Sequence, residues 1–433
     1  MANDGSANGE SDEANGTINA GSSSFSTGCT DTIVEHPIPI PLRVQLATIA
    51  NMAASPRLSS AALPAATIQS HASNLLQLRD KTLLCVWFGG SQEGLPDISI
   101  WLSRQEAGES TWSAPQKISS APNRSCQNPV LFRAPRTGDI WLFHTSQDAG
   151  NQDGAVVMAR TSSDNGVTWS EPHYPLGDKT GVFVRQPLVV LQDGTWVLPV
   201  FYCRSTPGQR WIGNNDISGL FYSRDDGKTW AESIVPDSVG SVHMQIVPPA
   251  QENLGYVAFF RSRWADCIYR ATSPDGLHWE APKATSLPNP NSGICAARLP
   301  SGKIALVFNR SASEPHLARR EGLYDDITPE DDTRPNQAAV NGKVAVWGTP
   351  RKTLTVGISD DDGVTWTERV LEEGDGFCMT NNSKEKTNRE LSYPSIWAEQ
   401  EAPNAPVHIA FTFHRQYIKY VRIQNIEQWV GSS

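Results

Sequence analysis

Four near-copies of one motif, Ser-x-Asp-x-Gly-x-Thr-Trp, constrain the fold of this 433-residue chain more than any other feature. Complete copies begin at Ser162, Ser223 and Ser359, a shortened copy begins at Ser273, and a degenerate fifth copy runs from Ser103 to Trp112. Asp and Ser side chains bond to the backbone of tight turns, and Gly supplies the positive φ that closes them. Each copy therefore predicts a β-hairpin turn followed by a Trp that packs on the neighbouring hairpin, a structural role rather than a catalytic one.

The spacing of the motif predicts a propeller. Its tryptophans recur every 49 to 61 residues and then leave a gap of 87 residues, the period expected of a four-stranded blade with its loops. The last gap holds a polar, Pro-rich stretch, 311–350, which predicts a loop inserted within the fifth blade. The 33 Gly and 30 Pro agree with short strands and tight turns. We therefore predict an all-β fold, a six-bladed β-propeller of four-stranded antiparallel blades.

Six units share one internal order, in which an apolar strand, a turn and a second strand precede a third strand that leads into the motif. The expected innermost strands are Leu75–Leu78, Pro129–Phe132, Pro187–Leu191, Gln245–Val247, Ile294–Leu299 and Tyr393–Trp397. The segment Arg43–Ala53 is available as the strand that closes the ring. A seventh blade built from residues 30–65 is the alternative.

Charge and composition exclude some classes of partner. The net charge of −10 argues against nucleic acid and anionic membranes, which need a basic surface, but it leaves room for an anionic small ligand held by a local Arg cluster. No apolar run reaches the roughly 18 residues of a membrane span. The seven Cys are scattered, and no set of side chains has metal-ligand spacing, so we expect no metal and no cofactor.

The domain organisation is expected to be simple. Residues 1–30 are rich in Gly, Ser, Asn, Asp and Glu and predict a disordered tail, whereas 31–433 predict a single propeller domain. Because the tail does not resemble a signal peptide, we expect either a cytosolic protein or a secreted one whose leader has been removed. We expect a monomer.

Polar residues at strand starts and in the following loops are the candidates for a ligand site at the mouth of the central channel. The set is His71, Glu93, His144, Arg160, Arg185, His243, Gln245, Arg261, Arg351 and Tyr393. The dipeptide His414-Arg415 is instead expected to form a surface turn.

Several of these residues carry a family resemblance. The repeats are Asp boxes, and together with Arg351-x-x-Leu354-x-Val356-x-x-Ser359 and Leu391-Ser392-Tyr393-Pro394-Ser395-Ile396 they resemble the sialidase superfamily over roughly 66–425. The resemblance implies that Arg351 and Arg261 belong to an Arg trio that grips the sugar carboxylate, and that Tyr393 attacks the anomeric carbon. His71 stands where sialidases have the first Arg, and Gln245, near His243, where they have the Glu that activates the Tyr.

A second resemblance points to other chemistry. His71-Ala72-Ser73 and Trp87-Phe88-Gly89-Gly90-Ser91-Gln92-Glu93-Gly94 resemble a sialidase-like branch of mostly unassigned activity and, more distantly, propeller lyases that act on uronates. That likeness implies His71 as base and acid, Arg160 as the group that neutralises the carboxylate, and His144 as its helper. Proton removal beside a carboxylate needs such a base and such a cation.

Three hypotheses follow. The first is an exo-acting glycosidase on a terminal acidic sugar, with Tyr393, His71, Glu93 and His144 as catalytic residues. Its substrate-binding residues would be Arg160, Arg185, His243, Gln245, Arg261 and Arg351. The second is a polysaccharide lyase that uses His71 for β-elimination next to a uronate, and the third is a non-catalytic glycan-binding propeller.

Overall fold

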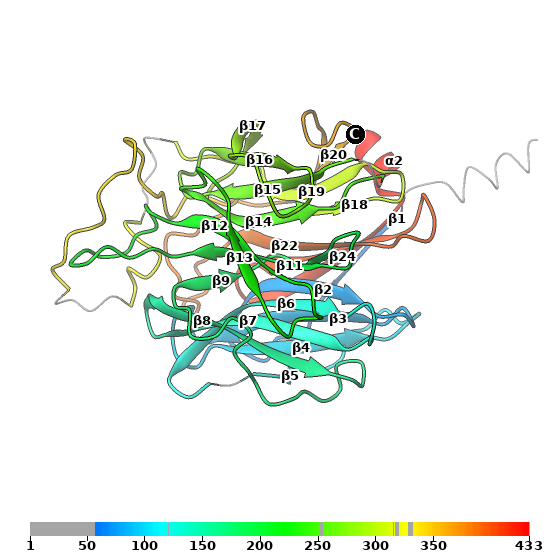
Figure 1. The fold of residues 1–433 in the computed structure, drawn as a ribbon, viewed down its shortest axis with the longest axis horizontal. Coiled ribbons are helices and arrows are strands. Elements are labelled where there is room, and N and C mark those ends of the chain that lie inside the picture. Colours follow the sequence, from blue (N-terminus) through cyan, green and yellow to red (C-terminus); the bar gives the residue numbers. More distant parts are fainter. Residues whose placement is uncertain are drawn as a thin grey trace, which may run out of the picture. The chain divides into compact units, whose positions relative to one another are not determined.

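The architecture is a ring of six antiparallel sheets. The computed structural model describes residues 57–119, 121–251, 254–314, 316, 320–327 and 332–432, and within these the strands form six separate sheets (Figure 1). The predicted all-β, six-bladed propeller is thus confirmed. The only helix in the described part of the chain is the short α2 (Ile426–Gly431) at its C-terminal end.

The blades follow one another along the chain. Blade 1 comprises β2 (Gln69–Gln77), β3 (Leu83–Gly90), β4 (Ser99–Gln105) and β5 (Gln116–Lys117), and blade 2 comprises β6 (Arg124–Arg133), β7 (Ile140–Asp148) and β8 (Asn151–Ser162). Blade 3 comprises β9 (Val182–Val184), β10 (Val189–Val190), β11 (Trp196–Tyr202), β12 (Ile217–Ser223) and β13 (Ala231–Ile234). Blade 4 comprises β14 (Ser241–Val247), β15 (Tyr256–Ser262), β16 (Cys267–Ser273) and β17 (Lys283–Pro288). Blade 5 comprises β18 (Cys295–Arg298), β19 (Ile304–Asn309), β20 (Thr353–Ser359) and β21 (Thr367–Glu373).

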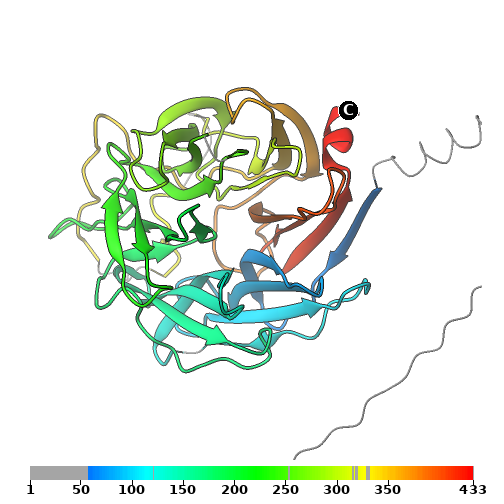
Figure 2. The same ribbon diagram turned by 45° about the vertical axis from the view of Figure 1, so that its right-hand side comes forward.

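Blade 6 closes the ring with strands from both ends of the described chain. It comprises β22 (Leu391–Ala398), β23 (Val407–Phe413), β24 (Tyr417–Gln424) and β1 (Arg57–Ala62), which pairs antiparallel with β24. Figure 2 shows β1, in dark blue, beside the red C-terminal strands. The shared blade joins the first and last strands of the described chain in one sheet and so closes the ring. The closing strand expected at Arg43–Ala53 lies outside the described residues.

The Asp boxes form the predicted hairpin turns. In the second blade, Asp164 Oδ1 accepts a hydrogen bond from the backbone N of Thr168 (2.9 Å), and Ser162 Oγ accepts one from Gly166 N (2.8 Å). Gly166 has φ 81°, a conformation that strains any other residue. Hydrogen bonds from Thr229 lower the pKa of the corresponding Asp225 to about 2. The Ser and Asp side chains of these boxes thus bond within their own turns.

The apolar core lies between neighbouring blades. One buried cluster joins Phe143 of blade 2 to Leu198 of blade 3, and the box tryptophan Trp230 packs against it. Rings of Phe143 and Trp230 meet edge to face with centroids 6.2 Å apart. A blade too small to bury its own faces is thereby stabilised by its neighbours.

Bulges in the innermost strands position the candidate site. The register shifts between His71 and Asn74 in β2, and equivalent shifts occur in β6, β14 and β22. At each shift one non-Gly residue is left-handed: Ala72, Asn128, His243 and Tyr393, with φ between 50° and 58°. A β-bulge bends its strand and re-aims the side chains beside it. Four blades thus repeat one distortion next to the central channel.

The segment predicted as an insertion connects β19 to β20 in blade 5 and reaches other blades. Trp347 donates its indole N–H to the carbonyl of Ile212 in blade 3 (2.9 Å). Tyr324 Oη accepts hydrogen bonds from Gln147 and Gln152 of blade 2, at 2.8 and 3.1 Å. These contacts hold the segment over the end of the channel where the bulges lie.

Candidate functional site

Tyr393 is the centre of a buried cluster in the channel. Its ring is 8% exposed and has two imidazole and three guanidinium neighbours. The ring centroids of His71 and His243 lie 4.3 and 5.7 Å from it, and the guanidinium carbons of Arg185, Arg261 and Arg351 lie 5.3, 5.5 and 5.6 Å from it. The structure thus brings together six of the ten candidates from the sequence, contributed by five blades or the segments beside them.

Arg261 forms a hydrogen bond with the hydroxyl oxygen of Tyr393. Its Nη1 donates to Tyr393 Oη at 2.5 Å, while its Nε donates to the Asn291 side-chain oxygen at 2.7 Å. A charged N–H donor held at this distance stabilises negative charge that develops on the oxygen. The contact therefore suits a tyrosine whose hydroxyl acts as a nucleophile.

Two arginines of the cluster are neutralised by two buried carboxylates. Glu390 accepts a hydrogen bond from Arg351 Nη1 (2.6 Å) and another from Arg415 Nε, and Arg415 Nη1 donates to Glu93 Oε2 (2.6 Å). Burial alone raises the pKa of Glu390, but Arg351 and Arg415 outweigh it and hold that pKa below its ordinary value. The four groups form one charge-balanced network.

Arg185 and Arg261, in contrast, have no carboxylate partner among the described residues. Arg185 donates only to the carbonyls of Tyr393 (3.2 Å) and Pro394 (3.1 Å), and its Nε is buried without a partner. Both side chains are about 1% exposed. Burial lowers the pKa of each, that of Arg261 to about 10. Buried charges are costly unless a counter-charge compensates them, so this half of the cluster fits an anionic ligand.

The two histidines are neutral bases. His71 Nδ1 hydrogen-bonds Thr412 Oγ1 (2.9 Å), and its Nε2 has no partner in the described structure; the same holds for His243 Nδ1. Burial, followed by the field of Arg415, keeps the pKa of His71 well below its ordinary value. Burial and then Arg261 do the same for His243. Each ring thus has one nitrogen without a hydrogen-bond partner in the described structure.

The remaining candidates lie elsewhere. Gln245 points to the opposite end of the channel, where it lines a cavity of about 800 Å³ with Leu76 and Ile396, so the structure places His243 rather than Gln245 beside Tyr393. His144 is buried on β7, where its Nδ1 donates a hydrogen bond to the carbonyl oxygen of Thr145 (3.3 Å), and burial lowers its pKa to about 4. Glu93 reaches the cluster only through Arg415.

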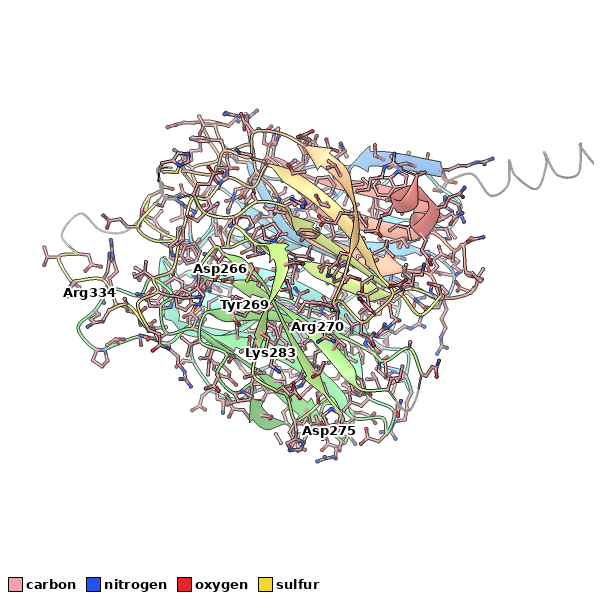
Figure 3. The ribbon with its side chains drawn as sticks, turned by 90° about the horizontal axis from the view of Figure 1, so that it is seen from above. Asp266, Tyr269, Arg270, Asp275, Lys283 and Arg334 are labelled. Carbon is pink, nitrogen blue, oxygen red and sulfur yellow. The ribbon has the colours of Figure 1, made fainter. Side chains whose placement is uncertain are left out.

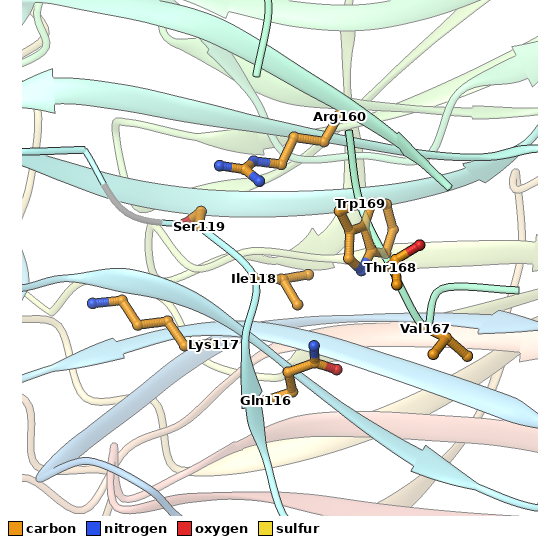
Figure 4. A pocket seen from close by; sticks show the side chains of 8 residues that line it. All are labelled: Gln116, Lys117, Ile118, Ser119, Arg160, Val167, Thr168 and Trp169. Atoms are coloured by element: carbon orange, nitrogen blue, oxygen red, sulfur yellow. The ribbon is translucent and has the colours of Figure 1, made fainter. Parts of the chain in front are cut away.

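Arg160 is separated from His71. It projects from β8 into a groove beside β5, the outermost strand of blade 1, with Lys117 and Trp169 (Figure 4). The charged groups near His71 include Arg415, Arg351, Arg185 and Arg261, and the Glu390 carboxylate lies 3.8 Å from its Nδ1. The pairing of His71 with Arg160, on which the lyase hypothesis depends, is therefore not formed.

The sequence reasoning missed Glu390 and Arg415. The prediction of a surface turn at His414-Arg415 is wrong for Arg415, which is 2% exposed. His414 and Arg415 both have left-handed backbone conformations, with φ of 55° and 56°. The turn that they form places the Arg415 guanidinium between Glu93 and Glu390. The one available signal was Glu390 itself, an acid three residues before Tyr393 and directly before β22.

The inserted segment covers the cluster. The Trp347 ring lies 5.9 Å from the guanidinium carbon of Arg261 and 5.0 Å from that of Arg263, which is paired with Asp216. The carbonyl of Val346 accepts a hydrogen bond from Asn291, the residue that also orients Arg261. A ligand at Arg261 would therefore be enclosed.

No group of three or more His, Cys, Asp or Glu side chains in the described ranges is arranged to hold a metal ion. No helix among them has the length and apolarity that a membrane crossing requires.

Comparisons with known proteins agree with the fold. A Hadza microbial sialidase has a TM-score of 0.61 at 16% identity; the alignment covers 84% of this chain and 66%, slightly under two thirds, of that chain. A Dyadobacter fermentans protein of unknown function has a TM-score of 0.61 at 17% identity, covering 86% and 99%. The leech intramolecular trans-sialidase, complexed with 2,7-anhydro-Neu5Ac, has a TM-score of 0.56 at 13% identity, covering 85% and 69%.

Sequence comparison is more specific about the family. Curated proteins include no match to the chain. The family model described as a BNR repeat-like domain matches residues 81–409, which contain the Asp boxes. The chain therefore belongs to the BNR repeat-like domain family, and its six-bladed propeller has the fold of the sialidases named above.

Proposed function

We propose that the protein is an exo-acting glycosidase that holds the carboxylate of a terminal acidic sugar at Arg185, Arg261 and Arg351. The observation that carries the proposal is the pair of buried guanidinium groups, Arg185 and Arg261, without carboxylate partners beside Tyr393. The four arginines Arg185, Arg261, Arg351 and Arg415 and the two glutamates Glu93 and Glu390 together carry two positive charges in excess. An enclosed cationic site at the end of a channel suits a terminal sugar better than an internal one.

Tyr393 is the proposed nucleophile. Its Oη would bond to the anomeric carbon while its proton passes to the neutral imidazole of His71 or His243. Arg261 would stabilise the charge on Oη during the attack. As the glycosidic bond breaks, the imidazolium returns the proton to the departing oxygen, and water then cleaves the glycosyl-tyrosine bond.

The alternatives have less support. The lyase hypothesis needs Arg160 near His71, and Arg160 lies in the groove beside β5 instead. A non-catalytic glycan-binding protein would use the same carboxylate site and would differ only in forming no product. The test below therefore distinguishes it from the glycosidase.

The test is a substrate panel. Purified protein would be incubated with sialosides, uronosides and their neutral counterparts, with released sugar and ultraviolet absorbance from new C=C bonds both followed. We expect sugar release from acidic substrates only, without absorbance, and its loss in Tyr393→Phe. Absorbance that disappears in His71→Ala would establish the lyase instead, and binding without any product would establish a binding protein.

A further inference from the structure

A groove between blades 1 and 2 departs from the repeat in a way that points to a second binding site. Arg160 stands two residues before the Ser of its Asp box and pairs across the sheet with Leu142. At the same register the other boxes carry Trp101, Phe221, Ala271 and Gly357. Phe221 and Ala271 are each 3% exposed, so this position normally completes the packing between blades. Only blade 2 has a cation there.

The Arg160 guanidinium is incompletely satisfied. Within the described chain it forms no ion pair; Nη1 donates to the Ser170 carbonyl (3.2 Å), and the buried Nε has no partner. The indole N–H of Trp169 beside it is likewise buried without an acceptor. Arg160 therefore keeps a positive charge at the wall of the groove that no carboxylate of the described residues compensates.

The rest of the groove adds charge and an apolar surface. It encloses about 530 Å³, within the usual range for small-ligand sites, and none of its eight lining residues is acidic although the whole chain carries −10. In Figure 4 the cationic ends of Arg160 and Lys117 lie to one side, and Trp169 and the 54%-exposed Val167 lie to the other. The arrangement offers cations to an anionic group and an apolar surface to the C–H face of a sugar ring.

We propose that this groove binds an acidic sugar unit, with its carboxylate or sulfate on Arg160 and Lys117 and its ring against Trp169 and Val167. The site is independent of the Tyr393 cluster and of the reaction proposed there. It would anchor an acidic glycan at the side of the propeller.

The test is calorimetric titration with tri-galacturonic acid, a sulfated galactotriose, unsulfated galactotriose and inorganic sulfate, with hydrogen exchange to locate the bound ligand. We expect one or both charged trisaccharides to bind and to protect peptides that cover 116–119 and 160–169. The stronger of the two identifies the anionic group. Galactotriose should bind at least about tenfold more weakly, the effect of losing one charged hydrogen bond.

Variants assign the binding to the groove. Arg160→Leu should weaken it about tenfold and fold normally, because this register accepts apolar residues in other blades. Lys117→Ala, at an exposed position, gives a second test should Arg160→Leu misfold. The matched control is Lys283→Ala. Lys283 lies on β17, opposite Arg270 of the neighbouring strand β16 in blade 4 (Figure 3), and lines none of the three described cavities.

Four results would overturn the proposal: no protection of these peptides by either charged trisaccharide, equal affinity for galactotriose, unchanged binding in both Arg160→Leu and Lys117→Ala, or full reproduction of the effect by sulfate alone. Tyr393→Phe should leave the protection in place. Failure of the glycosidase proposal and failure of the groove proposal are therefore distinguishable.

Discussion

The rim and the centre of this propeller use polar residues in opposite ways. On the rim, Asp164 bonds to Thr168 and Ser162 to Gly166, so the Ser and Asp of the box find their partners within a few residues of one turn. At the centre, Glu390 meets Arg351 and Arg415 from other strands, and Arg185 and Arg261 keep charges that nothing in the described protein neutralises. The hydrogen bonds within a box stabilise its turn, whereas buried arginines without carboxylate partners suit the binding of an anionic ligand.

The largest effect should follow from removing one oxygen at the centre. Tyr393→Phe should lower turnover of an acidic glycoside at least about 10³-fold, as loss of a nucleophile does, while the melting temperature stays near that of the wild type. The matched variant Tyr222→Phe, on β12 and packed at the blade 3–4 core, should retain full turnover. Equal loss in both variants would remove the distinction between the two tyrosines.

Breaking the buried network should cost the most stability. Glu390→Gln leaves Arg351 and Arg415 undercompensated, and we expect the free energy of unfolding to fall by about 3–5 kcal/mol. Glu232→Gln breaks a half-exposed pair with Lys179 on the rim and should cost less than about 1 kcal/mol. Urea unfolding of the two variants measures both values. Similar losses would show that the centre is no more tightly coupled than the rim.

One box hydroxyl should have a smaller effect. Ser223→Ala removes the acceptor of the Gly227 N–H (2.8 Å), and we expect a loss of about 1 kcal/mol without change in turnover. Thermal melting and activity assays on the same preparation check both halves. A drop in turnover larger than the drop in folded fraction would contradict a purely structural role for the box.

The two regions should also respond differently to acid. The pKa values of His71 and His243 are lowered on folding, so the unfolded chain takes up protons first and stability declines as pH falls below the ordinary value of 6.5. Asp225 has a pKa of about 2 against an ordinary 3.8, so its contribution is present above about pH 4 and is lost toward pH 2.

Unfolding free energies measured from pH 7 to pH 5 test the expected loss of stability from the two histidines. This loss should still be small near pH 6 and should grow toward pH 5. His71→Gln should flatten the dependence between pH 6.5 and 5, and Asp225→Asn should leave that range unchanged. A wild-type stability that stays constant down to pH 5 would contradict the buried, neutral histidines.

The limits of sequence reasoning follow the same division. The box turns and the second and third strands were predictable because apolar alternation and turn residues are local signals. The innermost strand of blade 1 was predicted at Leu75–Leu78, yet β2 spans Gln69–Gln77, because its first half is polar and buried around a bulge. Arg415 and Glu390 were missed since their value lies in contacts between distant segments, as in the pair of Arg415 with Glu93.

The most direct test of the central claim is the affinity of the site for an acidic monosaccharide and for its methyl ester, measured by calorimetry in the Arg160→Leu background so that the side groove contributes little. We predict that the free acid binds at least about tenfold more tightly than the ester, and that Arg261→Met removes most of this preference. Equal affinity for acid and ester would contradict a carboxylate site at Arg185 and Arg261.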